Sequence, residues 1–151
     1  MTTAHTVPIA NAGIVGDEIV VGTVSDLSGP IALLGVPVRD GMLMRFDEAN
    51  AAGGVHGRRI RLVVEDAGYD PKRAVLAAQK LVNQDKIFAM VGHIGTAQNM
   101  ATFPVLFPKN VINFFPVTAA REMYEPFHKL KYSFAATYYD QMRLAVPKMV
   151  K

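Results

Sequence analysis

Short apolar strands alternate along this chain with amphipathic helices, and this alternation restricts the fold more than any other feature. The run EIVVGTV, Glu18 to Val24, is rich in β-branched residues and apolar enough to be buried on both faces of a parallel sheet. RIRLVVED, residues 59–66, alternates apolar and charged side chains, which predicts a strand nearer a sheet edge. Three further strands are predicted at residues 86–92, 111–117 and 132–136.

Helical patterns separate these strands. The first predicted helix covers residues 36–52, where Met42, Phe46 and Ala49 recur at helical spacing. Asp70 and Pro71 form an N-cap pair for a second helix that ends near Gln84. A third helix follows the 86–92 strand and should end or kink at Pro104, and a last one begins within residues 137–151, with Pro147 near its end.

Short connections between strands and helices imply right-handed crossovers, so the predicted fold class is α/β. We expect a doubly wound, mostly parallel sheet of about five strands with helices on both faces, similar to flavodoxin. With 151 residues the chain can bury one core, which predicts one domain. A structure dominated by antiparallel hairpins would contradict this prediction.

Composition excludes several function classes. The 16 basic residues are interspersed with 13 acidic ones, and no basic patch is interleaved with aromatic residues, so no nucleic-acid partner is expected. The chain has no cysteine, and no apolar run reaches the ~18 residues that span a bilayer. Residues 1–17 lack the basic and apolar regions of a signal peptide, so we expect a flexible segment there and any export signal to have been removed.

Three loops follow the predicted strands at the edge where α/β sheets bind ligands: SDLSGPIALLG, GHIGTA and FPVTAA. Each loop has two interpretations. Ser28, Gly29 and Pro30 are common turn formers, but they also suit a binding loop. Thr96 fits a helix N-cap as well as an anion contact.

Catalytic and metal chemistry have little support in the sequence. No nucleophile elbow, phosphate-binding lysine loop or dinucleotide fingerprint occurs, and Glu65 and Asp66 have no assignable partner. His93 is interpreted as a structural histidine whose ring nitrogens form hydrogen bonds. The other histidines lack the spacing of metal ligands. The residues therefore give an enzyme no support, although they do not exclude one, and we expect no metal site and no cofactor.

The order of these motifs resembles the amino-terminal lobe of the periplasmic branched-chain amino-acid binding proteins. The resemblance rests on SGPIALLG, DEANAAGGVHGRRIRLVVEDAGYDPKRAVLAAQKLV, FAMVGHIGTA and FFPVTAA, in that order. It implies a type I periplasmic binding protein that serves an ABC importer and closes two lobes around a small ligand. It also implies a periplasmic or extracellular location, and ABC permease and ATPase subunits as partners.

The resemblance implies a set of ligand contacts, carried over position by position. Ser28 and Gly29 match the Ser-Gly-Pro loop, and Leu34 stands where the family often has an aromatic residue. Thr96 matches the hydroxyl residue that binds a ligand carboxylate. The full implied site is Ser28, Gly29, Leu34, Gly95, Thr96, Ala97, Val117 and Thr118.

Two departures from the family pattern bear on the ligand. The family's Pro-Ala-Ala-Thr reads Pro116-Val117-Thr118-Ala119 here, which moves the hydroxyl by one residue, and Leu34 replaces the aromatic. The resemblance therefore implies a small carboxylate-bearing ligand, amino-acid-like or an aromatic or aliphatic acid, without naming it. A sensing receptor of the same fold and a flavodoxin-like enzyme remain alternatives.

The resemblance also implies that residues 18–151 form only the first lobe and that the chain stops at the first crossover to the second. An isolated lobe would expose the surface that its partner normally covers. We expect such a lobe to associate with a second copy through apolar residues of the cleft and the last helix. We also expect it to bind its ligand poorly.

Overall fold

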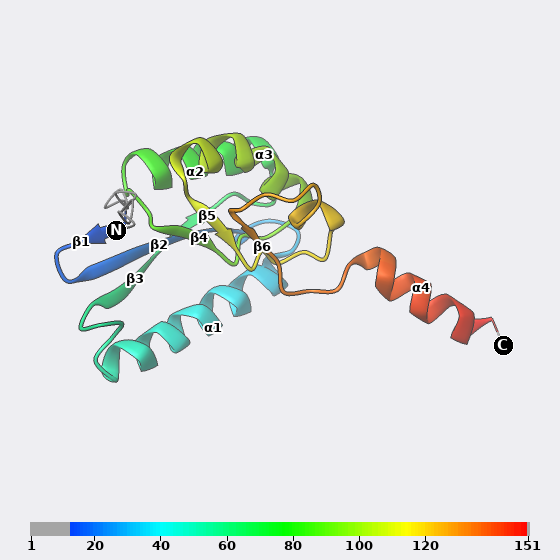
Figure 1. The fold of residues 1–151 in the computed structure, drawn as a ribbon, viewed down its shortest axis with the longest axis horizontal. Helices are drawn as coiled ribbons and strands as arrows, with labels where there is room; N and C mark the ends of the chain where they lie inside the picture. The colour runs from blue at the N-terminus through cyan, green and yellow to red at the C-terminus, as the bar shows by residue number, and fades with distance from the viewer. Residues whose placement is uncertain (1–12, 151) are drawn as a thin grey trace, which may run out of the picture.

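A computed structural model describes residues 13–150 of the chain. Five parallel strands form its central sheet (Figure 1), in the spatial order β3 (Arg59–Asp66), β2 (Glu18–Ser25), β4 (Ala89–Val91), β5 (Ile112–Phe114) and β6 (Lys131–Tyr132). The predicted fold class is confirmed. The edge position predicted for residues 59–66 is confirmed too, because β3 pairs only with β2.

The amino-terminal part of the sheet contains a strand that the sequence pattern does not predict. β1 (Ile14–Val15) pairs antiparallel with β2 inside the segment expected to be flexible. Gly16 and Asp17 join the two strands in a two-residue turn, and Gly16 has φ 60°, the positive value that such tight turns require. Residues 1–12, the rest of the expected flexible segment, lie outside the described part of the chain.

Helices cover both faces of the sheet. α2 (Pro71–Asn83) and α3 (Thr96–Leu106) pack side by side on one face, whereas α1 (Ala32–Ala51) lies against β3 and β2 on the other (Figure 1). α4 (Tyr138–Met149) extends away from this body. Two 3-10 turns, at Phe107–Lys109 and Arg121–Met123, complete the connections.

α1 begins four residues earlier than predicted. The helix starts at Ala32 and passes through Pro37, which lacks the N–H that would bond to the carbonyl of Leu33. Leu33 is 95% exposed, so water can reach this region of the helix. Likewise α3 continues for two residues beyond Pro104 before it changes to a 3-10 turn, so the predicted stop is confirmed to within one turn.

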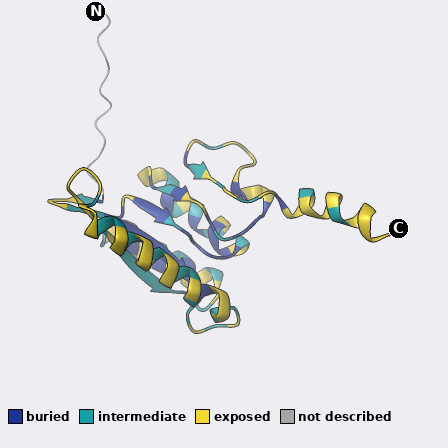
Figure 2. Cartoon of the chain, turned by 90° about the horizontal axis from the view of Figure 1, so that it is seen from below, coloured by how far each residue is buried: buried dark blue, intermediate teal, exposed yellow. Residues whose placement is uncertain are grey.

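The hydrophobic core lies between the sheet and α2. β2 turns Val20 and Val24 toward this layer, where no water reaches them. The buried core consists of Val20, Val24, Ala67, Ala74, Ala77, Ala78, Leu81, Val82, Ile87, Met90, Leu106 and Val111. In contrast, α1 buries only Gly35, and Figure 2 shows α1 and α4 as mostly exposed. The two faces of the sheet are therefore covered unequally.

Candidate functional site

Backbone hydrogen bonds bring two of the predicted binding loops together at the carboxyl edge of the sheet. Ile94 and Val117 form an isolated parallel bridge beyond the ends of β4 and β5. The N–H of Val117 donates to the carbonyl of His93 at 2.9 Å, and the N–H of Gly95 donates to the carbonyl of Val117 at 3.4 Å. These bonds place the residues that follow each strand beside one another.

The side chains of Thr96 and Thr118 meet at this junction. Their Oγ1 atoms lie 2.7 Å apart and share a hydrogen bond, although 22 positions separate them in the sequence. The backbone N–H of Ala120 donates to Thr118 Oγ1 at 3.2 Å, which orients the buried Thr118. Thr96 is half-buried and lies at the surface side of the pair.

The amino terminus of α3 reaches the same place. Gly95 is its N-cap residue with φ 90°, and no side chain caps the helix. A φ of 90° is a backbone conformation that residues with a Cβ rarely adopt, so the turn into the helix favours glycine at position 95. The first N–H groups of a helix lack intrahelical partners and attract anions, so this end of α3 together with Thr96 suits a carboxylate.

Two carboxylates hold the loop that follows β2. Asp26 is buried and accepts hydrogen bonds from the N–H groups of Gly29 and Ile31 at 2.6 and 2.7 Å. Asp66 accepts from the N–H groups of Leu27 and Gly68. Partial burial raises the pKa of Asp66, but hydrogen bonds from Ser28, Leu27 and Gly68 outweigh it and hold the pKa below its ordinary value.

This packing changes the interpretation of Ser28 and Gly29. The hydroxyl of Ser28 donates to Asp66, so it does not join the hydrogen bond between the other two hydroxyls of the implied site, those of Thr96 and Thr118. A Cβ at Gly29 would lie 2.6 Å from both Asp26 Oδ1 and the carbonyl of Gly68. Glycine is thus needed there because the loop packs closely against the chain's own backbone.

The structure therefore groups five of the eight predicted site residues. Gly95, Thr96 and Ala97 come from the start of α3, and Val117 and Thr118 follow β5. Leu34 lies in the first turn of α1 and is 49% exposed. Ser28, Gly29 and Leu34 thus belong to the neighbouring loop and helix start, and their place in a ligand site stays a prediction.

His93 is buried, as expected of a structural histidine, but it is not satisfied. Its side chain is fully buried, and neither ring nitrogen has a hydrogen-bond partner among the described residues. Burial disfavours the charged imidazolium and lowers the pKa of His93 to about 3. The ring is therefore neutral at physiological pH. No group of three potential metal ligands occurs within residues 13–150.

One further side chain, Tyr138, lies at the site and was not predicted from the sequence. Its hydroxyl lies 3.5 Å from Thr118 Oγ1, and its backbone N–H donates to the carbonyl of Ala119 at 2.9 Å. The hydrogen bond with Thr118 holds the pKa of Tyr138 below its ordinary value. Thr137 caps the start of α4 by accepting a hydrogen bond from the N–H of Asp140, and its hydroxyl donates to the Asp140 carboxylate. This Thr-x-x-Asp signal could have located the helix start, though not the contact of Tyr138 with Thr118.

A family model described as periplasmic binding protein matches residues 18–151. The leucine-, isoleucine-, valine-, threonine- and alanine-binding protein of Pseudomonas aeruginosa is 31% identical over 121 residues, which cover 80% of this chain and 32% of that protein. The Leu/Ile/Val-binding protein of Escherichia coli K12 is 30% identical over 107 residues, covering 71% of this chain and 29% of that protein. The chain thus spans about a third of the length of these relatives.

Solved structures agree with this result. A possible leucine/isoleucine/valine-binding protein from Rhodopirellula baltica superposes with a TM-score of 0.83 at 27% identity, over 89% of this chain and 36% of that one. A fatty acid ABC transporter substrate-binding protein from Thermomonospora curvata superposes with a TM-score of 0.80 at 25% identity, over 91% of this chain and 34% of that one.

These relatives bind substrates and are not enzymes, in agreement with the lack of catalytic motifs in the sequence. The family model extends from the start of β2 to the end of the chain and includes all the loops described above. This chain belongs to the periplasmic binding protein family.

Proposed function

We propose that this chain forms one wall of a cleft that captures a small organic acid, as part of the solute-binding component of an ABC importer. The observation that supports this proposal most directly is the Thr96 and Thr118 hydroxyl pair beside the uncapped start of α3. The hydroxyl of Thr96 and the first N–H groups of α3 are the donors available to a carboxylate. A second lobe would supply the opposite wall.

The proposed ligand is a carboxylate with an apolar tail. Relatives carry names that specify branched-chain amino acids, and a structural neighbour is named for fatty acids. Both ligand classes share a carboxylate and an aliphatic chain. Leu34, exposed in the first turn of α1, would face the apolar part of such a ligand.

The complete protein is proposed to act in the periplasm or outside the cell, with ABC permease and ATPase subunits as partners. The family supports this proposal, because its members deliver solutes to transporters. No helix within residues 13–150 is long and apolar enough to cross a membrane.

Native mass spectrometry of the complete protein, purified from its host, tests the proposal. We expect a co-purified acid of low mass. Calorimetry with leucine and octanoate then distinguishes the two ligand classes, and leucinamide, which lacks the carboxylate, serves as the matched control. A co-purified ligand without an acidic group, or equal affinity for leucine and leucinamide, would contradict the carboxylate site.

A further inference from the structure

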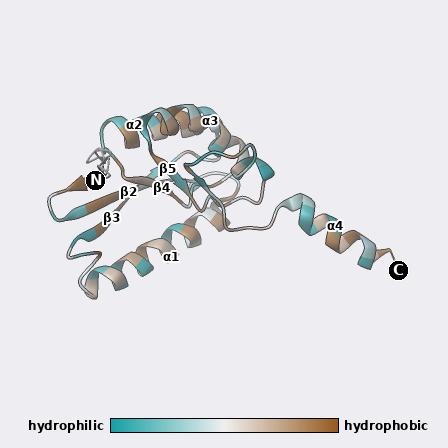
Figure 3. Ribbon diagram, in the orientation of Figure 1, coloured by the Kyte–Doolittle hydropathy of each residue, from teal (hydrophilic) through white to brown (hydrophobic). Residues whose placement is uncertain are grey.

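Three hydroxyl groups form a chain of hydrogen bonds where α3, the loop after β5 and α4 meet. Thr118 Oγ1 is at its centre, 2.7 Å from Thr96 Oγ1 and 3.5 Å from the hydroxyl of Tyr138. Thr96 lies at the surface side, and Tyr138 belongs to the first turn of α4. Figure 3 shows this turn as hydrophilic, unlike the apolar residues further along the helix. The direction in which the three protons point decides what Thr96 offers to a ligand.

The hydroxyl of Thr118 has one proton and two lone pairs. The backbone N–H of Ala120 donates to it at 3.2 Å and occupies one lone pair. One proton and one lone pair remain for the hydroxyls of Thr96 and Tyr138. Thr118 can therefore bond to both only if it donates to one of them and accepts from the other.

The two possible directions leave Thr96 with opposite properties. In the first, Tyr138 donates to Thr118 and Thr118 donates to Thr96, so the proton of Thr96 is available to an acceptor in the cleft. In the second, Thr96 donates to Thr118, so only its lone pairs remain for a ligand. Because an ionised carboxylate can only accept hydrogen bonds, the first direction alone permits a contact between Thr96 and an acid.

The chemistry of the phenol favours the first direction. A phenol is more acidic than the hydroxyl of threonine, so Tyr138 is the better donor and the poorer acceptor of the two. The backbone also fixes its position, because the N–H of Tyr138 donates to the carbonyl of Ala119 at 2.9 Å. Thr137 caps the same turn by accepting from the N–H of Asp140 at 2.9 Å. Tyr138 therefore donates to Thr118 from a fixed place.

We propose that Tyr138 is a positioning residue that directs the proton of Thr96 toward the ligand through Thr118. It thereby sets the preference of the site for an acceptor, such as a carboxylate, over the amide of the same molecule, whose nitrogen is a donor. This inference rests on the proposed function, because it concerns the specificity of the same site. Without the phenol hydroxyl, a lone pair of Thr118 becomes free to accept the proton of Thr96, which then competes with the ligand for it.

Calorimetry on the complete protein tests this role with an acid and its amide. The pair is leucine and leucinamide or octanoate and octanamide, whichever acid binds more tightly. We expect Tyr138→Phe to lower the ratio of acid affinity to amide affinity roughly 2- to 10-fold, the effect of one hydrogen bond between neutral groups. General loosening of the site would weaken both ligands alike and leave the ratio unchanged.

Tyr139→Phe is the matched control. It removes the same hydroxyl from the next residue, whose ring lies against the guanidinium of Arg121. The aromatic ring is retained in both variants, so the packing of the helix start changes little. We expect Tyr139→Phe to keep the affinity ratio of the original protein, and an equal drop in both variants would overturn the proposal.

A double mutant shows whether Tyr138 acts through Thr96. Thr96→Val removes the proton that Tyr138 is proposed to direct. In that background Tyr138→Phe should change the affinity for the acid by less than about twofold, because the two residues act on the same contact. A full effect of Tyr138→Phe in the Thr96→Val protein would overturn the indirect role.

Nuclear magnetic resonance of isotope-labelled tyrosine tests the contact between Tyr138 and Thr118 without a ligand. When the phenol ionises, Thr118 can turn its proton toward it, and this hydrogen bond holds the pKa of Tyr138 below its ordinary value. We therefore expect Thr118→Val to raise the pKa of Tyr138, whose signal is the one that disappears in Tyr138→Phe. An unchanged pKa would overturn the inference.

The affinity measurements separate this inference from the proposed function. If the original protein binds the acid no more tightly than its amide, the proposed function is wrong and this inference is wrong with it. If the original protein prefers the acid and Tyr138→Phe retains that preference in full, only this inference is overturned.

Discussion

At the scale of single residues, the two threonines of the site differ in how much freedom they retain. Thr118 is buried, and its hydroxyl already forms hydrogen bonds with Thr96, Ala120 and Tyr138. Little of its hydrogen-bonding capacity is left for a ligand. Thr96 is half-buried and stands at the start of α3. We therefore expect Thr96 to make the direct contact with a ligand and Thr118 to orient it.

Replacement of Thr96 by valine tests this difference in the complete protein. Thr96→Val removes the hydroxyl at nearly constant volume and should weaken binding of a carboxylate ligand by about 1.5–3 kcal/mol, the range for a hydrogen bond to a charged group. Thr96→Ser keeps the hydroxyl and should bind nearly as well as the original protein. Isothermal titration calorimetry measures both, and unchanged affinity in Thr96→Val would remove Thr96 from the site.

Buried His93 should make the free energy of unfolding depend on pH. Its pKa is about 3 in the folded chain and near 6.5 when unfolded, so between these values the unfolded state binds the extra proton. Stability is therefore highest above pH 6.5 and falls on acidification by about 1.4 kcal/mol per pH unit, or about 2 kcal/mol by pH 5. Urea unfolding at pH 7.5, 6 and 5 measures this loss.

His93→Leu is the matched variant, because leucine fills a similar volume and has no titratable group. We expect the acid-dependent loss between pH 7.5 and pH 5 to be smaller in this variant by about 2 kcal/mol. Equal pH dependence in the two proteins would mean that His93 does not remain neutral when the chain is folded.

At the scale of helices and strands, short-range signals indicated where most elements lie, but three strands are shorter than predicted: β4, β5 and β6 cover Ala89–Val91, Ile112–Phe114 and Lys131–Tyr132. α2 shows such a signal most clearly, since Asp70 caps it by accepting a hydrogen bond from the N–H of Arg73 at 2.8 Å and Pro71 occupies its first position. α1 shows the limit of such signals. The helix begins at Ala32, earlier than predicted, and its first turn packs against the backbone of Asp26. This close packing needs Gly35, because a Cβ there would lie 1.8 Å from the carbonyl oxygen of Asp26.

The cap of α2 provides a prediction for one element. Asp70→Ala should lower the free energy of unfolding by about 1 kcal/mol, because the exposed cap loses its bond to the N–H of Arg73. Asp70→Asn retains an acceptor oxygen and should have a much smaller effect. Chemical denaturation of the two variants compares them directly, and equal stabilities would show that the cap contributes little.

At the scale of the whole molecule, the described residues would supply only one side of the proposed binding cleft. The threonine pair and the start of α3 lie at an edge of the sheet, and the chain spans about a third of its relatives' length. Ligand pockets bury about 70–90% of a small molecule, which a single wall cannot achieve. Recognition of the proposed acid therefore depends on a second wall.

Affinity measurements on the chain alone test this dependence. We expect leucine and octanoate to bind the 151-residue chain far more weakly than the complete protein, because most of each bound molecule would stay in water. Calorimetry on both proteins under identical conditions provides the comparison. Tight, saturable binding by the short chain would show that this lobe contains a complete site.

The sequence alone determined the alternation of strands and helices, the parallel sheet, the edge position of β3 and the cap of α2. These features depend on residues a few positions apart, whose periodicity and hydrogen bonding act locally. It also identified the loops that meet at the carboxyl edge, since that edge follows from the α/β fold itself.

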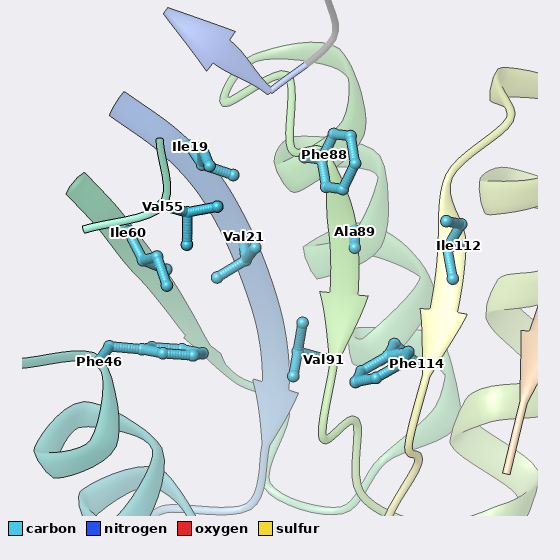
Figure 4. Close-up of a pocket in the computed structure, with 10 residues that line it drawn as sticks. All are labelled: Ile19, Val21, Phe46, Val55, Ile60, Phe88, Ala89, Val91, Ile112 and Phe114. Atoms are coloured by element: carbon cyan, nitrogen blue, oxygen red, sulfur yellow. The ribbon is translucent and has the colours of Figure 1, made fainter. Parts of the chain in front are cut away.

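Only the tertiary structure decided which side chains meet. Ser28 could have joined the threonine pair, but its hydroxyl donates a hydrogen bond to Asp66, 38 residues away in the sequence. Tyr138 reaches Thr118 because the connection after β6 returns α4 to the site, and no local pattern encodes that return. The apolar groove beside α1 (Figure 4) likewise brings together side chains from several strands, so it depends on packing across the whole sheet and not on any single segment.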